Sequence, residues 1–287
     1  MATVHANGIT QHVQRMGPPG DHDTHSAPGA ADVNDGPDRH AAPTVVFVHG
    51  LLTDSLASYY FTLAKPIADA GLPVLMYDLR GHGRTDRPPT GYAVDDFVAD
   101  LAALLDALAV PGRCYLVGNS FGGTIAFGFA ARHPDRVAGI VAIESEPATA
   151  AWSAKLAGIL DRAGRELHRR EALAWITLRY GTRTTRLAKS AAALLAATTL
   201  AADVPASRLL SDAEIRAIRC PVLAIYGEDS DLAVQAPLLA TLLPDCTTTI
   251  VAGQQHSVLV EVPHTVRDLL LSWIAAREQP HPAGATP

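Results

Sequence analysis

A serine between two glycines, placed where a strand pattern meets a helix pattern, limits the possible folds of this chain more than any other feature. Residues 118–122 read Gly-Asn-Ser-Phe-Gly. The apolar run 114–117 before them is typical of a short strand, and residues 124–133 have the small and bulky apolar side chains of a buried helix. Such a strand-to-helix turn forces Ser120 into a strained conformation with its hydroxyl exposed. Glycines are expected beside it, because a Cβ there would strike the strand or helix backbone.

The rest of the chain alternates between strand and helix patterns. Continuous apolar runs, typical of strands covered on both faces, occupy residues 44–49, 73–77, 139–143 and 221–226, and residues 248–251 are predicted as a further strand. Helix patterns occupy residues 58–70, 95–108 and 262–277. This alternation predicts an α/β protein with a mostly parallel, doubly wound sheet. Asn7-Gly8, between two mixed runs over residues 4–16, predicts an additional N-terminal hairpin with a type I′ turn.

The alternation stops over residues 147–219, which are helical by composition. We interpret this interval as a helical cap inserted over the C-terminal edge of the strands, where open α/β sheets bind ligands. One more layer of packing helices is the alternative. The core then comprises residues 1–146 and 220–287. Within it, residues 17–43 are rich in Pro, Gly, Asp, His and Ala, which predicts a flexible loop, and residues 279–287 are expected to form a loose tail.

Composition narrows the classes of partner. The chain has 287 residues, 48% of them hydrophobic, and a formal net charge of −6, enough for one large domain or for a core with a lid. An acidic balance without basic clusters argues against nucleic acid and against an anionic membrane. The most apolar stretch, residues 191–202, is too short to span a bilayer. A small molecule is therefore the expected partner, and the sequence does not indicate an oligomeric state.

Cysteine and histidine usage indicates the compartment and the absence of a metal. Three scattered cysteines and no secretory signal predict a reducing, cytoplasmic location. His22 and His25 flank acidic residues in the 17–43 loop, and we interpret them as solvated side chains rather than metal ligands. No phosphate-binding loop is present either. We expect neither a metal nor a cofactor.

A serine hydroxyl is a poor nucleophile at neutral pH and needs a base, usually a histidine held by a carboxylate. On a fold with this serine turn, the acid and then the histidine follow the serine in the chain. Carboxylates follow the strand 221–226, in Gly227-Glu228-Asp229-Ser230-Asp231, and a histidine follows the strand 248–251, in Gly253-Gln254-Gln255-His256. We predict His256 as the base, because the other histidines considered, His49, His82, His133 and His264, lie in tight glycine turns or at helix ends.

Taken together, these motifs resemble those of α/β-hydrolase-fold proteins of the esterase, carbon–carbon hydrolase and enol-lactonase type. The matching residues are His49-Gly50, Asp78-Leu79-Arg80-Gly81-His82-Gly83, Gly118-Asn119-Ser120-Phe121-Gly122-Gly123, Gly227-Glu228-Asp229 and Gly253-x-x-His256. They extend over about residues 45–273. The resemblance implies the α/β-hydrolase fold and a serine nucleophile, Ser120. We interpret the turn at 80–85 as structural, with Arg80 bracing neighbouring loops.

The resemblance leaves the acid open. In the family, the acid usually falls three residues after the glycine of the seventh-strand motif, a position that Ser230 occupies here. We favour the neighbouring Asp231, with Asp229 as the first alternative. Glu144 is the second alternative, since some relatives place the acid after the sixth strand.

The oxyanion hole is expected to consist of backbone N–H groups. One belongs to Phe121, the residue after the serine, and the resemblance assigns the other to Leu51. The N-terminus of the following helix favours negative charge at the same point.

These residues predict a cofactor-independent serine hydrolase that cleaves an ester, thioester or lactone through an acyl-enzyme on Ser120. Cap residues Trp152, Trp175, Leu194 and Leu195 favour a small to medium, mostly apolar metabolite. The alternatives are a carbon–carbon bond hydrolase of a ring-cleavage or polyketide-like product, a non-hydrolytic cyclase or dehydratase, and a ligand-binding protein on the same fold.

Overall fold

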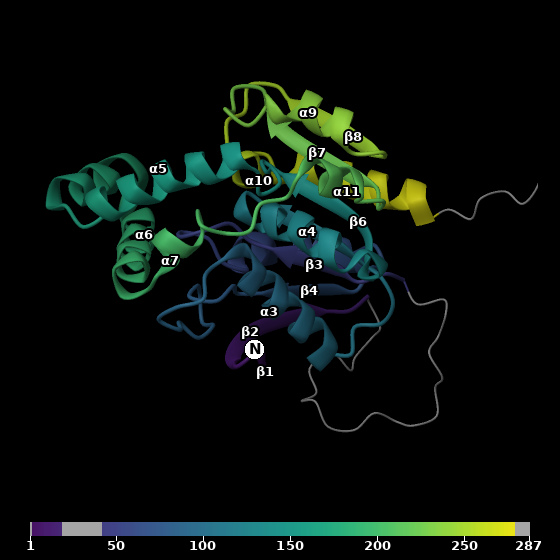
Figure 1. Cartoon of the computed structure of the whole chain (residues 1–287), viewed down its shortest axis with the longest axis horizontal. Helices are drawn as coiled ribbons and strands as arrows, with labels where there is room; N and C mark the ends of the chain where they lie inside the picture. Colours follow the sequence, from purple (N-terminus) through teal and green to yellow (C-terminus); the bar gives the residue numbers. More distant parts are fainter. Residues whose placement is uncertain (1, 19–41, 279–287) are drawn as a thin grey trace, which may run out of the picture.

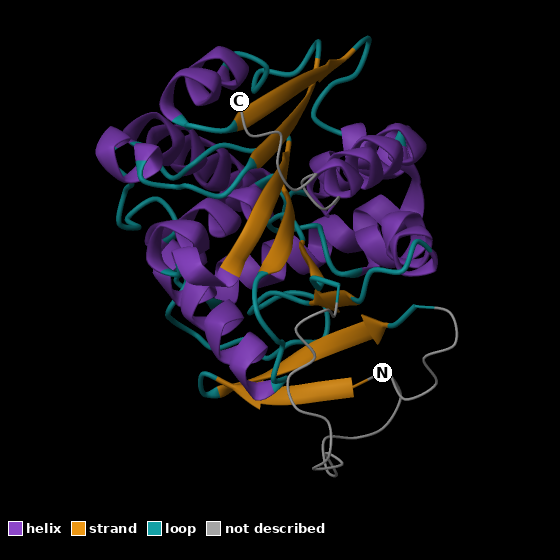
Figure 2. Ribbon diagram, turned by 90° about the vertical axis from the view of Figure 1, so that its right-hand side faces the viewer, coloured by secondary structure: helices purple, strands orange, loops and turns teal. Residues whose placement is uncertain are grey.

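The computed structural model describes residues 2–18 and 42–278, in which an eight-stranded sheet lies between helices (Figures 1 and 2). The strand order is β1-β2-β4-β3-β5-β6-β7-β8. The strands are β1 (Ala2–Ala6), β2 (Ile9–Met16), β3 (Val45–Val48), β4 (Val74–Tyr77), β5 (Cys114–Asn119), β6 (Val137–Ile143), β7 (Val222–Gly227) and β8 (Cys246–Val251). From β4 to β8 every neighbouring pair is parallel, so the predicted α/β class and mostly parallel sheet are confirmed. Most of the predicted loop, with His22 and His25, lies outside the described residues, as does the tail.

The N-terminal hairpin is also confirmed. β1 and β2 pair antiparallel, and the two turn residues, Asn7 and Gly8, have φ of 50° and 73°. Positive φ at both central residues is the requirement of a type I′ turn. β2 then pairs antiparallel with β4 and extends the parallel sheet at that side.

Alternate residues of the central strands enter two separate hydrophobic clusters. Along β3, Val46 and Val48 belong to one cluster, and Val45 and Phe47 belong to the other. Helices α3 (Val94–Ala107) and α4 (Phe121–Arg132) cover the first cluster. The helical segment α1 (Ala57–Tyr59), η1 (Tyr60–Ala64) and α2 (Lys65–Asp69), with α11 (Pro263–Glu278), covers the second. Apolar side chains on both faces explain the continuous hydrophobic strand patterns.

Two helical features differ from the prediction. The helix expected over 58–70 contains a wide π turn, η1, between α1 and α2. A helix that the sequence did not predict, α9 (Gln235–Leu242), precedes β8. Its sequence has no charged face opposite the buried one and contains Pro237, so it has no clear helical periodicity. Two short helical segments, η2 (Pro134–Arg136) and α10 (Val258–Glu261), precede β6 and α11, respectively.

The interval between β6 and β7, every residue of which is described, contains helices and no strand. These are α5 (Ala150–Glu166), α6 (Arg170–Ala197), α7 (Leu200–Asp203) and α8 (Asp212–Arg216). Figure 1 shows α5 and α6 reaching outward from the sheet. α6 bends at Gly181, whose φ is 82°. The division into a core and a 147–219 cap domain stays a prediction. None of the described helices combines the length and the apolar character that a membrane crossing requires.

Candidate active site

The turn at Ser120 has the strained geometry that the sequence predicts. Ser120 joins β5 to α4 with φ of 51° and ψ of −119°, and its N–H donates to the carbonyl of Ile143 at 2.9 Å. A Cβ on Gly118 would collide with the backbone of Gly123, and one on Gly122 with the carbonyl of Val48. Both glycines therefore allow the strand and helix to approach closely, which fixes the serine at the sheet edge.

His256 lies between Ser120 and a buried carboxylate. Its Nε2 is 3.2 Å from Ser120 Oγ, and its Nδ1 is 3.0 Å from Oε2 of Glu144. Three segments far apart in sequence, after β5, β6 and β8, supply these side chains. Glu144 is fully buried, whereas the His256 side chain is 55% exposed. This is the geometry of a serine–histidine–carboxylate triad.

The carboxylate against the histidine is therefore that of Glu144, not that of the favoured Asp231. Asp231 and Asp229 are exposed, and in the described structure neither makes a hydrogen bond or ion pair with His256. Both line the cavity above the serine. A sequence signal for Glu144 exists: an acidic residue directly follows the wholly apolar β6 while a serine occupies the usual acid position.

Two groups at the C-terminal end of β7 and directly after it hold the Glu144 carboxylate. Its Oε1 accepts the backbone N–H of Gly227, and its Oε2 accepts the hydroxyl of Ser230 at 2.5 Å. Ser230 is thus a donor to the carboxylate from the position where the family usually has the acid. Each of these hydrogen bonds helps to fix the orientation of the Glu144 carboxylate.

Backbone strain is concentrated at this site. Five described non-glycine residues have positive φ, and three of them, Leu52, Ser120 and Glu144, line one cavity. The other two lie in the N-terminal hairpin and after α3. Such conformations persist where the surrounding structure determines them, and they gather at functional sites.

The cavity has a volume of about 570 Å³ and is mostly apolar. α5 forms one wall with Trp152, Leu156, Ile159 and Leu160, which places the segment between β6 and β7 over the serine. A further α5 side chain, Lys155, also lines the cavity. It pairs with the buried carboxylate of Glu146. Burial lowers the pKa of Lys155, and the carboxylate of Asp231 acts in the opposite direction.

The two N–H groups predicted for the oxyanion hole border this cavity. Leu51 and Phe121 both line it, and in the described structure neither N–H donates to a protein acceptor. Phe121 is the first residue of α4, so its N–H lies at the positive end of the helix dipole. Backbone N–H groups beside a serine nucleophile are the donors that bind an oxyanion, and the assignment of this role to Leu51 and Phe121 stays a prediction.

His82 holds the loop that contains Leu51. The N–H of the next residue, Leu52, donates to His82 Nε2 at 2.9 Å, and His82 Nδ1 donates to the carbonyl of Arg80 at 2.8 Å. These partners fix the neutral tautomer. Burial and the adjacent His49 lower the pKa of His82 to about 3.

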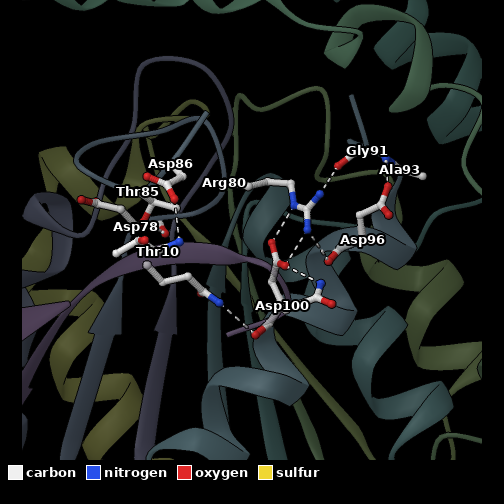
Figure 3. A network of polar contacts seen from close by, with 11 residues as sticks. Thr10, Asp78, Arg80, Thr85, Asp86, Gly91, Ala93, Asp96 and Asp100 are labelled. Carbon is white, nitrogen blue, oxygen red and sulfur yellow. Dashed lines mark hydrogen bonds and ion pairs between the residues drawn. The ribbon is translucent and has the colours of Figure 1, made fainter. Parts of the chain in front are cut away.

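Arg80 lies in a polar network outside the cavity lining (Figure 3). Its guanidinium pairs with Asp100 of α3 at 2.5 Å, and it also donates to the carbonyl of Gly91. Asp100 accepts a further hydrogen bond from Asn7 in the hairpin turn. The network thus ties three segments of the core together, consistent with a structural role for the turn at 80–85.

Comparison with known proteins gives the family. A model of the alpha/beta hydrolase fold matches residues 43–182. The 2-(acetamidomethylene)succinate hydrolase of Mesorhizobium japonicum is 31% identical, over 83% of this chain and 90% of that protein. The chain belongs to the alpha/beta hydrolase family.

Solved structures of family members share the fold. The crystal structure of an E-2-(acetamidomethylene)succinate hydrolase superposes with a TM-score of 0.69 at 24% identity, covering 96% of this chain and 98% of that one. The enol-lactonase of Burkholderia xenovorans gives 0.65 at 19% identity, covering 96% and 100%. The α/β-hydrolase fold predicted from the motifs is confirmed, and the protein is a hydrolase-family enzyme with esterase-like relatives. Among the described residues, no group of three or more His, Cys, Asp and Glu side chains is disposed to hold a metal.

Proposed function

We propose that this protein is a cofactor-independent serine hydrolase that cleaves an ester, thioester or lactone of a small to medium, mostly apolar metabolite. The observation that carries the proposal is the continuous hydrogen-bonded path from Ser120 through His256 to Glu144 beneath an apolar cavity. Its volume of about 570 Å³ fits a small-molecule substrate.

In the proposed mechanism, Ser120 Oγ attacks the substrate carbonyl and transfers its proton to His256 Nε2. Glu144 accepts the Nδ1–H of the histidine and stabilises the imidazolium. The N–H groups of Leu51 and Phe121 bind the oxyanion. His256 then protonates the leaving group, and a water molecule deprotonated by His256 hydrolyses the acyl-enzyme. The proton transfers follow the hydrogen bonds of Ser120 and Glu144 with His256.

We test the proposal by labelling with a fluorophosphonate probe and by assays on nitrophenyl esters of increasing acyl length. We expect labelling of the wild type and its loss in Ser120→Ala and His256→Ala. Loss of a triad member lowers kcat by about 10⁴-fold or more. Asp231→Asn is the matched carboxylate control. An unlabelled wild type would favour a ligand-binding protein.

Labelling alone does not distinguish hydrolysis from other chemistry. Turnover in oxygen-18-labelled water places the label in the acid product if an acyl-enzyme is hydrolysed. Conversion of a substrate without incorporation of the label would instead favour a cyclase or dehydratase. Release of a ketone-derived fragment and an acid would favour the carbon–carbon hydrolase.

We also propose a reducing, cytoplasmic location. All three cysteines are free, and the most buried, Cys114, has its pKa raised to about 12 by burial. Unpaired, unreactive thiols are typical of proteins in reducing compartments. Cell fractionation with a compartment marker would test this, and recovery outside the cytoplasm would contradict it.

A further inference from the structure

The helical arm formed by α5 and α6 differs in charge from the rest of the chain. Between Ala150 and Ala197 there are nine Lys or Arg residues and three Asp or Glu residues, a formal charge of +6. Because the whole chain carries −6, the remainder carries −12. Apart from Arg169 and Arg170, the basic residues of the arm are three or more positions apart, so they form no long run in the sequence. The expectation of no membrane partner depended on the chain-wide balance, which hides this separation of charge.

The basic side chains of the arm are available to a partner. Six of them are exposed and make no ion pair with any carboxylate in the described part of the chain: Arg162, Arg170, Arg179, Arg183, Arg186 and Lys189. Figure 1 shows that α5 and α6 lie away from the sheet. This separation places the positive charge at one end of the molecule.

Large apolar side chains accompany this charge on the first half of α6. Trp175 is 58% exposed, Leu178 is 89% exposed and Tyr180 is 57% exposed. The rings of Trp175 and Tyr180 pack edge to face with their centroids 5.6 Å apart. The guanidinium of Arg179 lies over the Tyr180 ring. Trp175 and Leu178 are three residues apart and share one face of the helix. Exposing these side chains to water is costly unless a partner covers them.

We propose that this surface of α6 docks on the anionic surface of a lipid bilayer. Trp and Tyr side chains are favoured at the depth of the lipid headgroups, where an exposed Leu can insert among acyl chains. The surrounding arginines are attracted by acidic headgroups. α5, which forms a wall of the cavity, belongs to the same arm, so docking would bring the cavity close to the bilayer.

Two other occupants fit the surface less well. A second copy docked arm to arm would bring together two surfaces that each carry +6, and like charges repel. Nucleic acid would use the arginines, but phosphate contacts are polar and would leave Trp175 and Leu178 without a role. A bilayer uses both kinds of side chain.

The first experiment is flotation of the full chain with vesicles of phosphatidylcholine alone or mixed with phosphatidylglycerol. We expect binding only to the mixed vesicles and a decrease with added salt. Arg183→Glu should weaken binding by roughly fivefold or more per charge removed. Leu178→Ser should also weaken it, because it removes a side chain that can insert among acyl chains. The matched controls on the core, Lys65→Glu and Phe61→Ser, replace side chains that are similarly exposed and should bind as the wild type does.

A second readout uses the tryptophans. Trp152 and Trp273 are buried, so Trp175 is the exposed one of three. Its emission should shift to shorter wavelength on mixed vesicles, and Trp175→Phe should abolish the shift. Ser120→Ala should bind vesicles normally, which separates this inference from the proposed hydrolase activity.

Three results would overturn the inference. The first is absence of wild-type binding to mixed vesicles, and the second is equal loss of binding in the arm and core variants. The third is a wild-type dimer in light scattering that becomes a monomer in Leu178→Ser, which would make the surface a self-association interface. Circular dichroism checks that each variant is folded.

Discussion

The segments after β6 and after β7 lie side by side at the sheet edge but contribute differently to the candidate site. The segment after β6 supplies Glu144, fully buried and at a φ of 51°, which contacts the histidine. The segment after β7 supplies Ser230, which donates to that carboxylate, while its own acids, Asp229 and Asp231, remain exposed. Adjacent strand ends in a parallel sheet bring their side chains to the same edge, and here only the segment after β6 places a carboxylate against the histidine.

The largest expected effect comes from the segment after β6. We expect Glu144→Gln to lower kcat by about 10⁴-fold while the protein stays folded, because an amide neither orients the histidine correctly nor stabilises the imidazolium. Steady-state kinetics on the best nitrophenyl ester measures this. A loss no greater than that of Asp231→Asn would contradict the assignment.

A transfer of the acid between the two segments is the next test. The double variant Glu144→Gln with Ser230→Asp places a carboxylate at the position that the family usually uses. We expect it to recover roughly a hundredfold over Glu144→Gln alone, and not the full rate, since small misplacement of a catalytic group costs about 10²-fold. Glu144→Gln with Asp231→Glu is the control, and equal activity of the two double variants would sink the idea of exchangeable positions.

The loop after β3, which contains Leu51 and is held by His82, provides a further test. Burial lowers the pKa of His82 to about 3, against about 6.5 in an unfolded chain. As pH falls between these values, the unfolded state binds a proton and the folded state does not. The free energy of unfolding should then fall by about 1.4 kcal/mol per pH unit from this group alone. Urea unfolding across this range should show a shallower pH dependence in His82→Gln, and an unchanged slope would contradict the buried neutral histidine.

The hydrogen bond between the two segments should have a smaller effect. Ser230→Ala removes one donor to the buried carboxylate, and a bond to a charged group contributes about 1.5–3 kcal/mol. We expect kcat to fall roughly tenfold with little change in KM. Ser230→Thr keeps a hydroxyl and should retain most of the activity, so equal losses in both variants would point to packing instead.

The smallest effect is expected from the exposed acids after β7. Asp231→Asn and Asp229→Asn should each change kcat by no more than about twofold, because exposed side chains without specific partners rarely matter to stability or rate. Nitrophenyl ester hydrolysis by the two variants is compared with that of Glu144→Gln. A large loss in Asp231→Asn would contradict the assignment of the acid to Glu144 and favour Asp231.

Much of the architecture could be predicted because it depends on local pattern. Asn7-Gly8 determined a hairpin turn, and the apolar runs of β3, β4 and β7 determined strands covered on both faces. The glycines beside Ser120 determined the close strand-to-helix turn. α9 was missed because its eight residues have no amphipathic period to detect.

The sequence by itself determined that a serine and a histidine would reach one edge of a parallel sheet, since each follows the C-terminal end of a strand. Only the tertiary structure decided which carboxylate meets that histidine. Glu144 and Asp231 both follow strand ends. The distance of each from His256 depends on how β6, β7 and β8 pair in the sheet and on the strained φ at Glu144. The charge of the arm was likewise present in the sequence, but its concentration at one end of the molecule required α5 and α6 to pack together and project from the sheet (Figure 1). Local pattern determines an element, whereas contact between distant elements determines a site.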